Sequence, residues 1–445
     1  MRKIRLNEIL SAIQGKTSYK KNISFDKIFI DSRKVCGNNS VFFALNGNNF
    51  DGHNFVHNAF ENGSKMAIVQ FKPKNIKNSD KLIFVENTLQ TLQDFSYYYK
   101  NLFEIPIIGI TGSVGKTMAK EYIANVLSEK FKVHKTKGNL NSIIGLPLTL
   151  FEMNNCDEIS VLELATDHFG EIKKLTKICD PEIAIITNIG ASHLEFLNDI
   201  DGVFREKYDI FKFSKKDSLK IFNGNIKHLE KFKNKNNFLS YGKNDQNNFV
   251  ISTISKENKI YKFKLNGENY FINSDVKHNI FNSIPAIIIG KHFGLKSSEI
   301  QNGLSKNPEV NLRMQILKNE SKNWTIIADC YNANPQSMKS ALEYLKSLSN
   351  ENCKHKFAIL GDMLELGKKE IKFHEEIGEL ARKVNLDKII SIGELSKFYR
   401  SNLHFKSTAD FLLSEKNISF PKNSTILIKA SRKLELEKIV ERLVK

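Results

Sequence analysis

The stretch IPIIGITGSVGKTMAKEYIANVL, residues 105–127, constrains the fold of this chain more than any other part of the sequence. Its first seven residues are mainly apolar and β-branched, as in a buried parallel strand. Five side chains then recur at the spacing of one apolar helical face: Ala119, Tyr122, Ile123, Val126 and Leu127. We therefore predict a strand, a glycine-rich loop and a helix, which is a unit of an α/β fold with a parallel sheet.

The glycine-rich loop has the chemistry of a phosphate-binding site. Gly112 and Gly115 allow the backbone a tight path, and the N–H groups and dipole at a helix start attract phosphate. The lysine of such a loop, here Lys116, reaches the β- and γ-phosphates, and the next hydroxyl, here Thr117, binds Mg²⁺. The usual spacing G-x-x-x-x-G-K-[ST] needs a glycine where Ile110 stands. A chance Gly-Lys-Thr in a turn is the alternative, but the strand and helix around it favour a nucleoside triphosphate site.

Two polar residues follow other apolar runs that we expect to be strands of the same sheet. Glu163 lies near the end of EISVLEL (158–164), and His193 lies just beyond EIAIITNI (182–189). Open α/β sheets bind ligands at the carboxyl ends of their strands, and a carboxylate there suits a Mg²⁺ that bridges ATP phosphates. Each residue alone is typical of a capping or surface group, but beside a phosphate loop both are candidate metal ligands. The pattern around Lys207 indicates a lysine on a helix surface.

Strand-like and helix-like runs divide the chain into three segments. Residues 1–83 hold short strand-like runs separated by Gly and Asn turns, residues 84–310 hold the phosphate loop, and residues 311–445 again alternate strands with helices. The last segment contributes the runs WTIIADC, KFAILGD, KIISIGE and STILIKAS. We predict three α/β domains: a small N-terminal domain, a central parallel-sheet domain and a smaller C-terminal domain.

Composition and charge indicate which partners and which cellular compartment to expect for the protein. The formal net charge of +18 permits a nucleic-acid partner, but lysine is spread over the whole chain, and residues 211–237 lack aromatic side chains at a stacking spacing. Five scattered cysteines without a C-x-x-C pair favour a reducing cytoplasm over a disulfide framework or a zinc site. No apolar run approaches the about 18 residues of a membrane span, and the N-terminus has no signal-peptide core. We expect a cytoplasmic protein that neither enters a membrane nor binds nucleic acid.

Several motifs together resemble one family, the ATP-dependent Mur ligases of peptidoglycan precursor synthesis. The phosphate loop of that family has the form T-G-[ST]-x-G-K-T, which residues 111–117 match, and this form has no glycine at position 110. The element YNANP resembles the branch that adds D-Ala-D-Ala, because the branch that adds the third peptide residue usually has D-Y-A-H-x-P. The other strings follow the family's order over nearly the whole chain: DSRKV (31–35), FFALNGNNFDGHNF (42–55), GNLNSIIGLPLTL (138–150), TNIGASHLEF (187–196), REKYDIF (205–211), HNIFN (278–282), DCYNANPQSM (329–338), LGDMLELG (360–367) and KASR (429–432).

The resemblance implies a site for ATP and for two Mg²⁺ ions. Lys116 would contact the phosphates, Thr117 and Glu163 would bind the first Mg²⁺, and His193 would bind the second. Lys207 matches the family lysine that CO₂ converts into a carbamate, which supports the second metal. The implied ATP-binding residues are Gly112, Ser113, Val114, Gly115, Lys116, Thr117, Asn279, Asn282, Arg313 and Asp329.

The resemblance also implies a uridine-nucleotide-binding N-terminal domain, a central P-loop ATPase domain and a Rossmann-like C-terminal domain. The implied reaction joins D-Ala-D-Ala to UDP-N-acetylmuramoyl-tripeptide through an acyl phosphate and releases ADP and phosphate, and we expect the enzyme to be a monomer. The third peptide residue is left open between meso-diaminopimelate and L-lysine. The implied substrate-binding residues are Ser32, Arg33, Gly47, Asp51, Gly52, His53, Asn139, Asn141, Tyr331 and Asn334.

Some residues depart from the family pattern, although we still expect an active enzyme. Asp167 stands where relatives have asparagine, Ser142 and Ile143 stand where they often have asparagine and glutamate, and Met118 replaces a hydroxyl residue after Thr117. The alternatives are another Mur-type or folylpolyglutamate-synthase-like amide ligase, a nucleic-acid-stimulated P-loop ATPase, and a binding protein without activity. The uridine-type segment and YNANP argue against the first, and the intact phosphate loop argues against the last.

Overall fold

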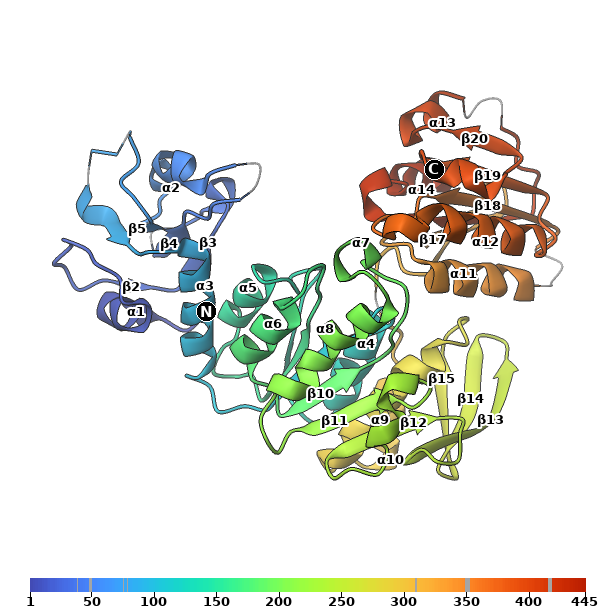
Figure 1. The fold of residues 1–445 in the computed structure, drawn as a ribbon, viewed down its shortest axis with the longest axis horizontal. Helices are drawn as coiled ribbons and strands as arrows, with labels where there is room; N and C mark the ends of the chain where they lie inside the picture. The colour runs from blue at the N-terminus through green and yellow to red at the C-terminus, as the bar shows by residue number, and fades with distance from the viewer. Residues whose placement is uncertain are drawn as a thin grey trace.

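The computed structural model describes residues 1–37, 39–47, 50–74, 76–77, 79–308, 310–348, 353–414 and 418–445. Three lobes follow one another along the chain, each built around its own sheet (Figure 1). The central lobe lies between the other two, which stand apart on either side of it (Figure 1). Among the described helices, none combines the length and the apolar character that a membrane span needs.

The N-terminal lobe is a small α/β unit. Its four-stranded sheet is parallel throughout, and an antiparallel strand pair and two helices accompany it. The strands confirm the short runs predicted from the sequence. In chain order the elements are β1 (Ile4–Arg5), α1 (Leu6–Ile13), β2 (Ser24–Phe25), β3 (Lys27–Phe29), β4 (Ser40–Phe43), α2 (Val56–Glu61), β5 (Met66–Val69) and β6 (Leu82–Phe84).

The central lobe contains a nine-stranded mixed sheet. Seven neighbouring strands are parallel, as the sequence predicts: β8 (Val133–Lys135), β9 (Ile159–Glu163), β7 (Ile107–Thr111), β10 (Ile183–Ile186), β11 (Leu219–Asn223), β12 (Phe238–Gly242) and β13 (Phe249–Glu257). The predicted parallel sheet is present, and an antiparallel hairpin extends it: β14 (Ile260–Leu265) and β15 (Glu268–Asn273). Asn266 and Gly267 join these two strands with positive φ angles of 47° and 85°, a pairing that favours a tight hairpin.

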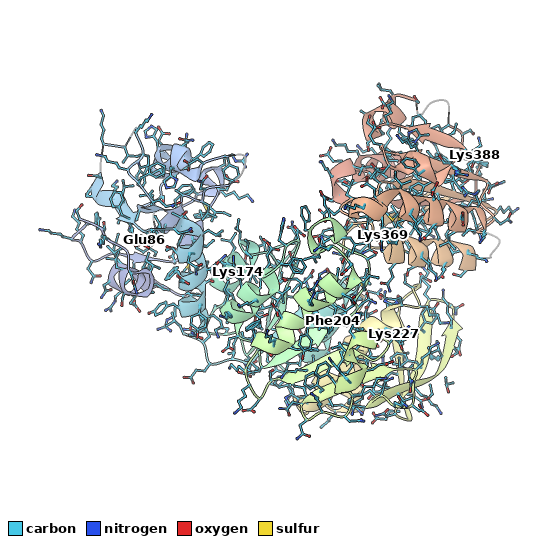
Figure 2. All side chains as sticks on the ribbon, viewed as in Figure 1. Glu86, Lys174, Phe204, Lys227, Lys369 and Lys388 are labelled. Atoms are coloured by element: carbon cyan, nitrogen blue, oxygen red, sulfur yellow. The ribbon has the colours of Figure 1, made fainter. Side chains whose placement is uncertain are left out.

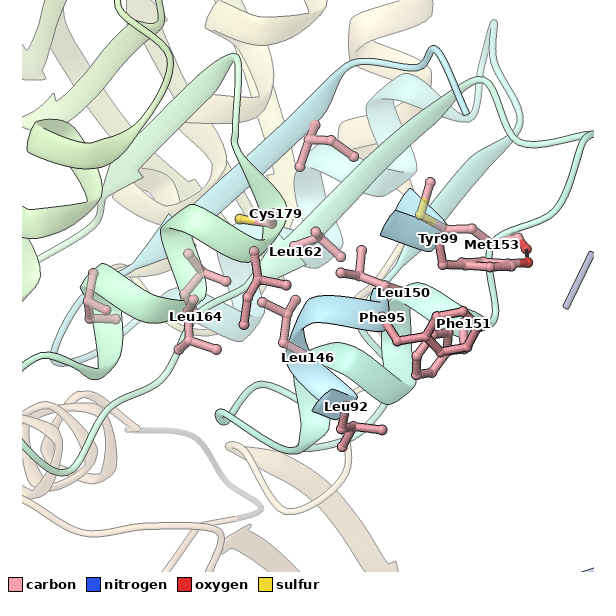
Figure 3. Packing of buried hydrophobic residues seen from close by; sticks show 14 of the residues in the cluster. Leu92, Phe95, Tyr99, Leu146, Leu150, Phe151, Met153, Leu162, Leu164 and Cys179 are labelled. Carbon is pink, nitrogen blue, oxygen red and sulfur yellow. Dashed lines mark hydrogen bonds between the residues drawn. The ribbon is translucent and has the colours of Figure 1, made fainter. Parts of the chain in front are cut away.

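Helices cover both faces of this sheet because side chains of successive strand residues point to opposite faces. The first face is covered by α3 (Thr88–Lys100), α5 (Gly145–Phe151), α6 (Glu171–Cys179) and α8 (Ile200–Phe213), whose apolar side chains form one core with Leu162 and Ile186. Figure 3 shows part of this core, with Leu92 and Phe95 of α3, Leu146 of α5 and Leu162 of β9. The second face is covered by α4 (Lys116–Leu127), α9 (Asn279–His292) and α10 (Ser297–Ser305). The predicted apolar face of α4 is buried at all of its positions, Ala119, Tyr122, Ile123, Val126 and Leu127.

The C-terminal lobe confirms the second α/β unit with its own sheet. The sheet is parallel except for its first strand, and its order is β16 (Gln315–Asn319), β17 (Trp324–Asp329), β21 (Ser424–Lys429), β18 (His355–Gly361), β19 (Lys388–Ile392) and β20 (Leu403–Phe405). The four apolar runs predicted as strands are β17, β18, β19 and β21. The helices of the lobe are α11 (Pro335–Ser347), α12 (Glu370–Arg382), α13 (Thr408–Ser414) and α14 (Glu437–Val444).

The C-terminal lobe docks on the central lobe through the short helix α7 (Leu194–Leu197). A turn of 3₁₀-helix over Gly367–Lys369 contacts α7, and Lys369 is labelled at this side of the C-terminal lobe in Figure 2. Phe373 of α12 packs against the apolar cluster formed by Leu194, Leu197 and Val203. The two lobes therefore meet next to the strand ends that carry the predicted ligands.

Candidate active site

A cavity of about 300 Å³ lies between the central and C-terminal lobes. It collects the phosphate loop, the end of β9 and the beginning of α9 from one lobe, and the ends of β17 and β21 from the other. Most of the residues predicted for ATP and metal line it: Ser113, Val114, Gly115, Lys116, Thr117, Glu163, His193, Asn279, Asn282, Arg313 and Asp329. The predicted substrate residues Asn141, Tyr331 and Asn334 line the same cavity.

The phosphate loop has the backbone that its glycines predict. Gly112 and Gly115 have φ angles of +151° and +85°, and a Cβ atom at Gly115 would lie 2.4 Å from Oδ1 of Asn282. Helix α4 begins at Lys116, so its first N–H groups face the loop. The Nζ atom of Lys116 donates a hydrogen bond to the carbonyl of Gly112 at 2.7 Å, and burial lowers the pKa of this lysine.

The segment after β10 fixes the conformation of the loop. The hydroxyl of Thr187 donates to the carbonyl of Val114 at 2.6 Å. The hydroxyl of Ser113 accepts the N–H of Gly190 at 3.0 Å and also accepts a hydrogen bond from the hydroxyl of Ser192. These bonds connect the loop to the segment after β10 and restrict its conformation.

Thr117 and Glu163 form the oxygen pair expected of a Mg²⁺ site. Glu163 is the last residue of β9 and is paired in register with Ile110 of β7, so its side chain stands beside the loop. Its carboxylate accepts hydrogen bonds from the Thr117 hydroxyl and from the side-chain amide of Asn141, each at 2.9 Å. Its backbone N–H donates to the Thr136 hydroxyl at 3.0 Å, and the side chain is 1% exposed. A buried carboxylate next to a hydroxyl fits Mg²⁺, which prefers oxygen ligands.

His193 stands at the start of α7, where the two lobes meet. Its Nδ1 atom lies 2.6 Å from a carboxylate oxygen of Glu365 in the C-terminal lobe and 3.2 Å from a carboxylate oxygen of Asp167. These three side chains are a group able to hold a cation. Glu365 belongs to the LGDMLELG string but is not among the residues predicted from the sequence, because it meets His193 only through the docking of the two lobes.

Lys207 lies on α8 but is not the surface lysine that its local pattern indicates. The side chain is 1% exposed, and burial lowers its pKa to about 7, with the charge of Lys116 acting in the same direction. Lys207 does not appear among the described residues that line the cavity, yet it is close enough to Lys116 for their charges to interact. A lysine with this pKa is half neutral near pH 7.

Both lobes form the part of the cavity that is predicted to hold the nucleoside. Asn279 begins α9, donates to the Ser274 hydroxyl at 2.9 Å and accepts from the Asn282 amide at 3.1 Å. From the C-terminal lobe, the guanidinium of Arg313 lies over the ring of Tyr331, 4.0 Å from its centroid. The cationic Arg313 therefore has a fixed position in the cavity that contains the phosphate loop.

The ends of β17 and β21 carry a buried ion pair. The Nζ atom of Lys429, which is 1% exposed, donates to the Asp329 carboxylate at 2.7 Å and to the carbonyl of Asn332 at 2.8 Å. Asn334 caps α11 by accepting the N–H of Ser337 at 2.9 Å. Lys429 opens the KASR string but is not among the site residues predicted from the sequence.

Other predicted substrate residues lie elsewhere. Arg33 pairs with Asp31 at 2.9 Å and its side chain is 87% exposed. Both ring nitrogens of the buried His53 have a hydrogen-bond partner within the lobe: Nδ1 lies 2.6 Å from the Asp51 carboxylate, and Nε2 accepts the N–H of Gln70 at 2.9 Å. Asn139 is an exposed residue of the central lobe that is not among the cavity residues. The predicted residues in the N-terminal lobe are Ser32, Arg33, Gly47, Asp51, Gly52 and His53.

Three family models match the chain and together span most of it. A model described as Mur ligase family, catalytic domain, matches residues 24–122. Mur ligase middle domain matches residues 110–290, and Mur ligase, glutamate ligase domain, matches residues 312–432.

Individual relatives and solved structures agree with these models. The UDP-N-acetylmuramoyl-tripeptide–D-alanyl-D-alanine ligase of Bacillus subtilis strain 168 is 35% identical over 93% of this chain and 92% of its own length. MurF from Acinetobacter baumannii has a structure that matches with a TM-score of 0.88 and 26% identity, covering 100% of this chain and 99% of its own. MurF from Thermotoga maritima, solved in complex with ADP, matches with a TM-score of 0.82 and 28% identity over 93% of this chain and 96% of its own. The chain therefore belongs to the Mur ligase family.

Proposed function

We propose that this protein joins D-Ala-D-Ala to UDP-N-acetylmuramoyl-tripeptide with ATP, releasing ADP and phosphate. The observation that carries the proposal is a single cavity in which a phosphate loop, the buried carboxylate of Glu163 and the cationic side chains of Lys116 and Arg313 face one another. Full-length similarity to ligases named for this reaction supports the choice of substrates.

ATP occupies the cavity with its phosphates at the start of α4. Residues 112–117 bind the phosphate chain with backbone N–H groups, and Lys116 exchanges its bond to the Gly112 carbonyl for bonds to the β- and γ-phosphates. Asn279 and Asn282 face the adenine, and Asp329 binds the ribose. Arg313 meets the phosphates from the C-terminal lobe, so both lobes contact the same nucleotide.

Two divalent cations fit the donor atoms present. Thr117 and Glu163 offer oxygen ligands for the first ion, and His193 offers a ring nitrogen for the second. A Mg²⁺ ion supplies neutralisation of phosphate charge during phosphoryl transfer.

Lys207 supports the second cation as a carbamate. Its pKa of about 7 leaves a neutral amine that would attack CO₂: a nitrogen–carbon bond forms while one C=O π bond breaks, the nitrogen releases one proton, and the neutral amine becomes an anionic carbamate. The nearby ammonium of Lys116 favours the anionic product in this buried position.

The reaction proceeds in two steps. A carboxylate oxygen of the peptide attacks the γ-phosphorus while the bond to ADP breaks, which gives an acyl phosphate. The amine of D-Ala-D-Ala then attacks the activated carbonyl, loses a proton and expels phosphate. Lys116 and Arg313, which line the same cavity, offset charge on the transferring phosphoryl group. Closure of the two lobes around the substrates would exclude water that hydrolyses the acyl phosphate.

The N-terminal lobe binds the UDP-sugar through its loops around Ser32 and His53, with Arg33 exposed for a phosphate or sugar contact. Asn141, Tyr331 and Asn334 hold the reacting groups between the other two lobes. We place the domain boundaries near residues 83 and 310, and we infer a monomer that works in the cytoplasm on soluble precursors.

A phosphate-release assay tests this function. The complete mixture contains the protein, ATP, Mg²⁺, UDP-tripeptide and D-Ala-D-Ala, and each component is omitted in turn. Release that requires every component supports the proposal, and release indifferent to D-Ala-D-Ala or to the UDP-tripeptide contradicts it. Lys116→Ala should lose most of the activity, whereas wild-type turnover in that variant would show that the phosphate loop is assigned wrongly.

A further inference from the structure

His193 has a carboxylate partner on the neighbouring lobe. Its Nδ1 atom lies 2.6 Å from Oε2 of Glu365, a distance typical of a strong charge-assisted hydrogen bond. His193 is mostly buried, with 17% of its side chain exposed, whereas 42% of the Glu365 side chain is exposed. The imidazole therefore has one ring nitrogen engaged across the boundary between the lobes.

One backbone hydrogen bond and the apolar packing between the lobes hold Glu365 at this position. The N–H of Glu195 donates to the Glu365 carbonyl at 3.1 Å, and Phe373 packs on the apolar cluster of α7 beside it. His193 and Glu365 both have positive φ angles, 54° and 62°. Residues other than glycine keep such a backbone where the surroundings enforce it. The position of the carboxylate thus depends on the docking of the C-terminal lobe.

The chemistry of metal-bound histidine gives this contact a role. A histidine that binds a metal through one ring nitrogen almost always donates the other ring N–H to a carboxylate, carbonyl or water. The partner selects the tautomer and fixes the ring orientation. With Nδ1 committed to Glu365, Nε2 is the nitrogen left for a ligand in the cavity that His193 lines.

A second carboxylate competes for the same proton. Asp167, which belongs to the same lobe as His193, lies 3.2 Å from Nδ1, farther than Glu365. A single N–H cannot serve both carboxylates equally, and the shorter distance gives it to Glu365 in the docked arrangement.

We propose that Glu365 is a positioning residue for His193, so that the second metal site is completed only when the C-terminal lobe docks. This inference rests on the proposed function, because it takes its metal from the ligase reaction. Docking of the lobe and affinity for the second cation are then thermodynamically linked: each increases the other.

The test measures Mn²⁺ binding by electron paramagnetic resonance, with the full-length protein and a non-hydrolysable ATP analogue. We expect two Mn²⁺ sites in the wild type. Glu365→Ala should weaken the weaker site about 10- to 100-fold and leave the stronger one unchanged, and Glu365→Gln, which keeps an acceptor oxygen, should restore part of the affinity. Glu195→Gln, in helix α7 two residues after His193, changes an exposed carboxylate; it is the matched control and should bind like the wild type.

A second variant separates positioning from docking. Phe373→Ala removes a docking contact but touches neither ring nitrogen of His193, and it should also weaken the second Mn²⁺ site. A wild type with only one Mn²⁺ site would overturn the inference, and so would an unchanged Mn²⁺ affinity in Glu365→Ala. X-ray scattering shows whether the lobes of Phe373→Ala have separated, and an unchanged affinity in a separated protein would overturn the inference as well. If phosphate release does not depend on D-Ala-D-Ala and the UDP-tripeptide, the proposed function fails. The Mn²⁺ titration still reports whether Glu365 affects the second site.

Discussion

The hydroxyl of Thr117 donates a hydrogen bond to the carboxylate of Glu163 at 2.9 Å, although 46 positions separate the two residues in the sequence. One side chain begins a helix and the other ends a neighbouring strand, so the parallel sheet brings them together. We expect Glu163→Gln, which keeps the shape and removes the charge, to lower kcat about 10²- to 10³-fold through lost cation binding. Steady-state phosphate release measures this.

The control for this variant is Glu152→Gln, which removes an equally charged group from an exposed ion pair with Lys137. Such surface pairs contribute at most about 1 kcal/mol, so activity should stay at the wild-type level. Equal activity in Glu163→Gln and the wild type would rule out a metal role for Glu163.

Gly115 and Gly170 offer a matched pair of substitutions. Both cap a helix start with nearly the same backbone, φ +85° and +84°, but a Cβ atom at Gly115 would lie 2.4 Å from Asn282, whereas a Cβ at Gly170 meets nothing within 4 Å. Alanine should destabilise both sites by about 1–2 kcal/mol through the left-handed backbone. Thermal unfolding measures that shared cost, and only Gly115→Ala should also raise the KM for ATP. An equal KM in the two variants would contradict the geometry of the loop.

Lys207 should make activation by bicarbonate depend on pH. The folded chain releases the Lys207 proton as the pH rises through about 7, whereas the unfolded chain keeps it until about 10.4. Between these two pH values the contribution of Lys207 to the free energy of unfolding increases with pH. The fraction of Lys207 that is a neutral amine increases with pH as well. Activity in CO₂-depleted buffer should therefore recover with bicarbonate more fully at a pH of about 8 than at about 6.

A ¹³C-carbamate signal from labelled bicarbonate, absent in Lys207→Ala, is the spectroscopic check. A short carboxylic acid should restore part of the activity of Lys207→Ala, because it supplies the missing carboxylate. A wild-type enzyme that is fully active without CO₂ and shows no carbamate signal would refute this role.

Removing one partner of the buried ion pair between Asp329 and Lys429 should lower the thermal stability of the C-terminal lobe. Lys429→Met leaves the Asp329 carboxylate largely buried without its cation, and breaking such a pair costs about 3–5 kcal/mol. The double variant Asp329→Asn/Lys429→Met should unfold at a higher temperature than Lys429→Met, because both charges are gone. Differential scanning calorimetry of the C-terminal transition compares them, and equal Tm values for the wild type and Lys429→Met would contradict the pairing.

Local sequence patterns predict much of this structure. The strand, loop and helix around Lys116 follow from periodicity and from the conformational needs of glycine. The position of Glu163 follows from a general rule, since parallel strands place their carboxyl ends at one edge of the sheet. The hairpin of β14 and β15 also has a local sequence signal, because Asn266 and Gly267 are typical residues of a two-residue hairpin turn.

Contacts between residues far apart in the sequence, within a sheet or between lobes, are the part that sequence patterns miss. Glu365 meets His193, and Lys429 meets Asp329, over separations of 172 and 100 residues. No periodicity links such residues, because their distance depends on how whole sheets and lobes pack. The burial of Lys207 is of the same kind: a lysine on a helix looks exposed until the neighbouring elements cover it.

The most direct test of the account follows oxygen from the peptide to the phosphate. The UDP-tripeptide is prepared with ¹⁸O in its terminal carboxylate and incubated with the protein, ATP, Mg²⁺ and D-Ala-D-Ala, and the released phosphate is analysed by mass spectrometry. An acyl phosphate requires one ¹⁸O atom to leave with each phosphate while the other remains in the new amide. Phosphate carrying one ¹⁸O is the result that the account predicts, and unlabelled phosphate, which indicates hydrolysis of ATP by water, would contradict it.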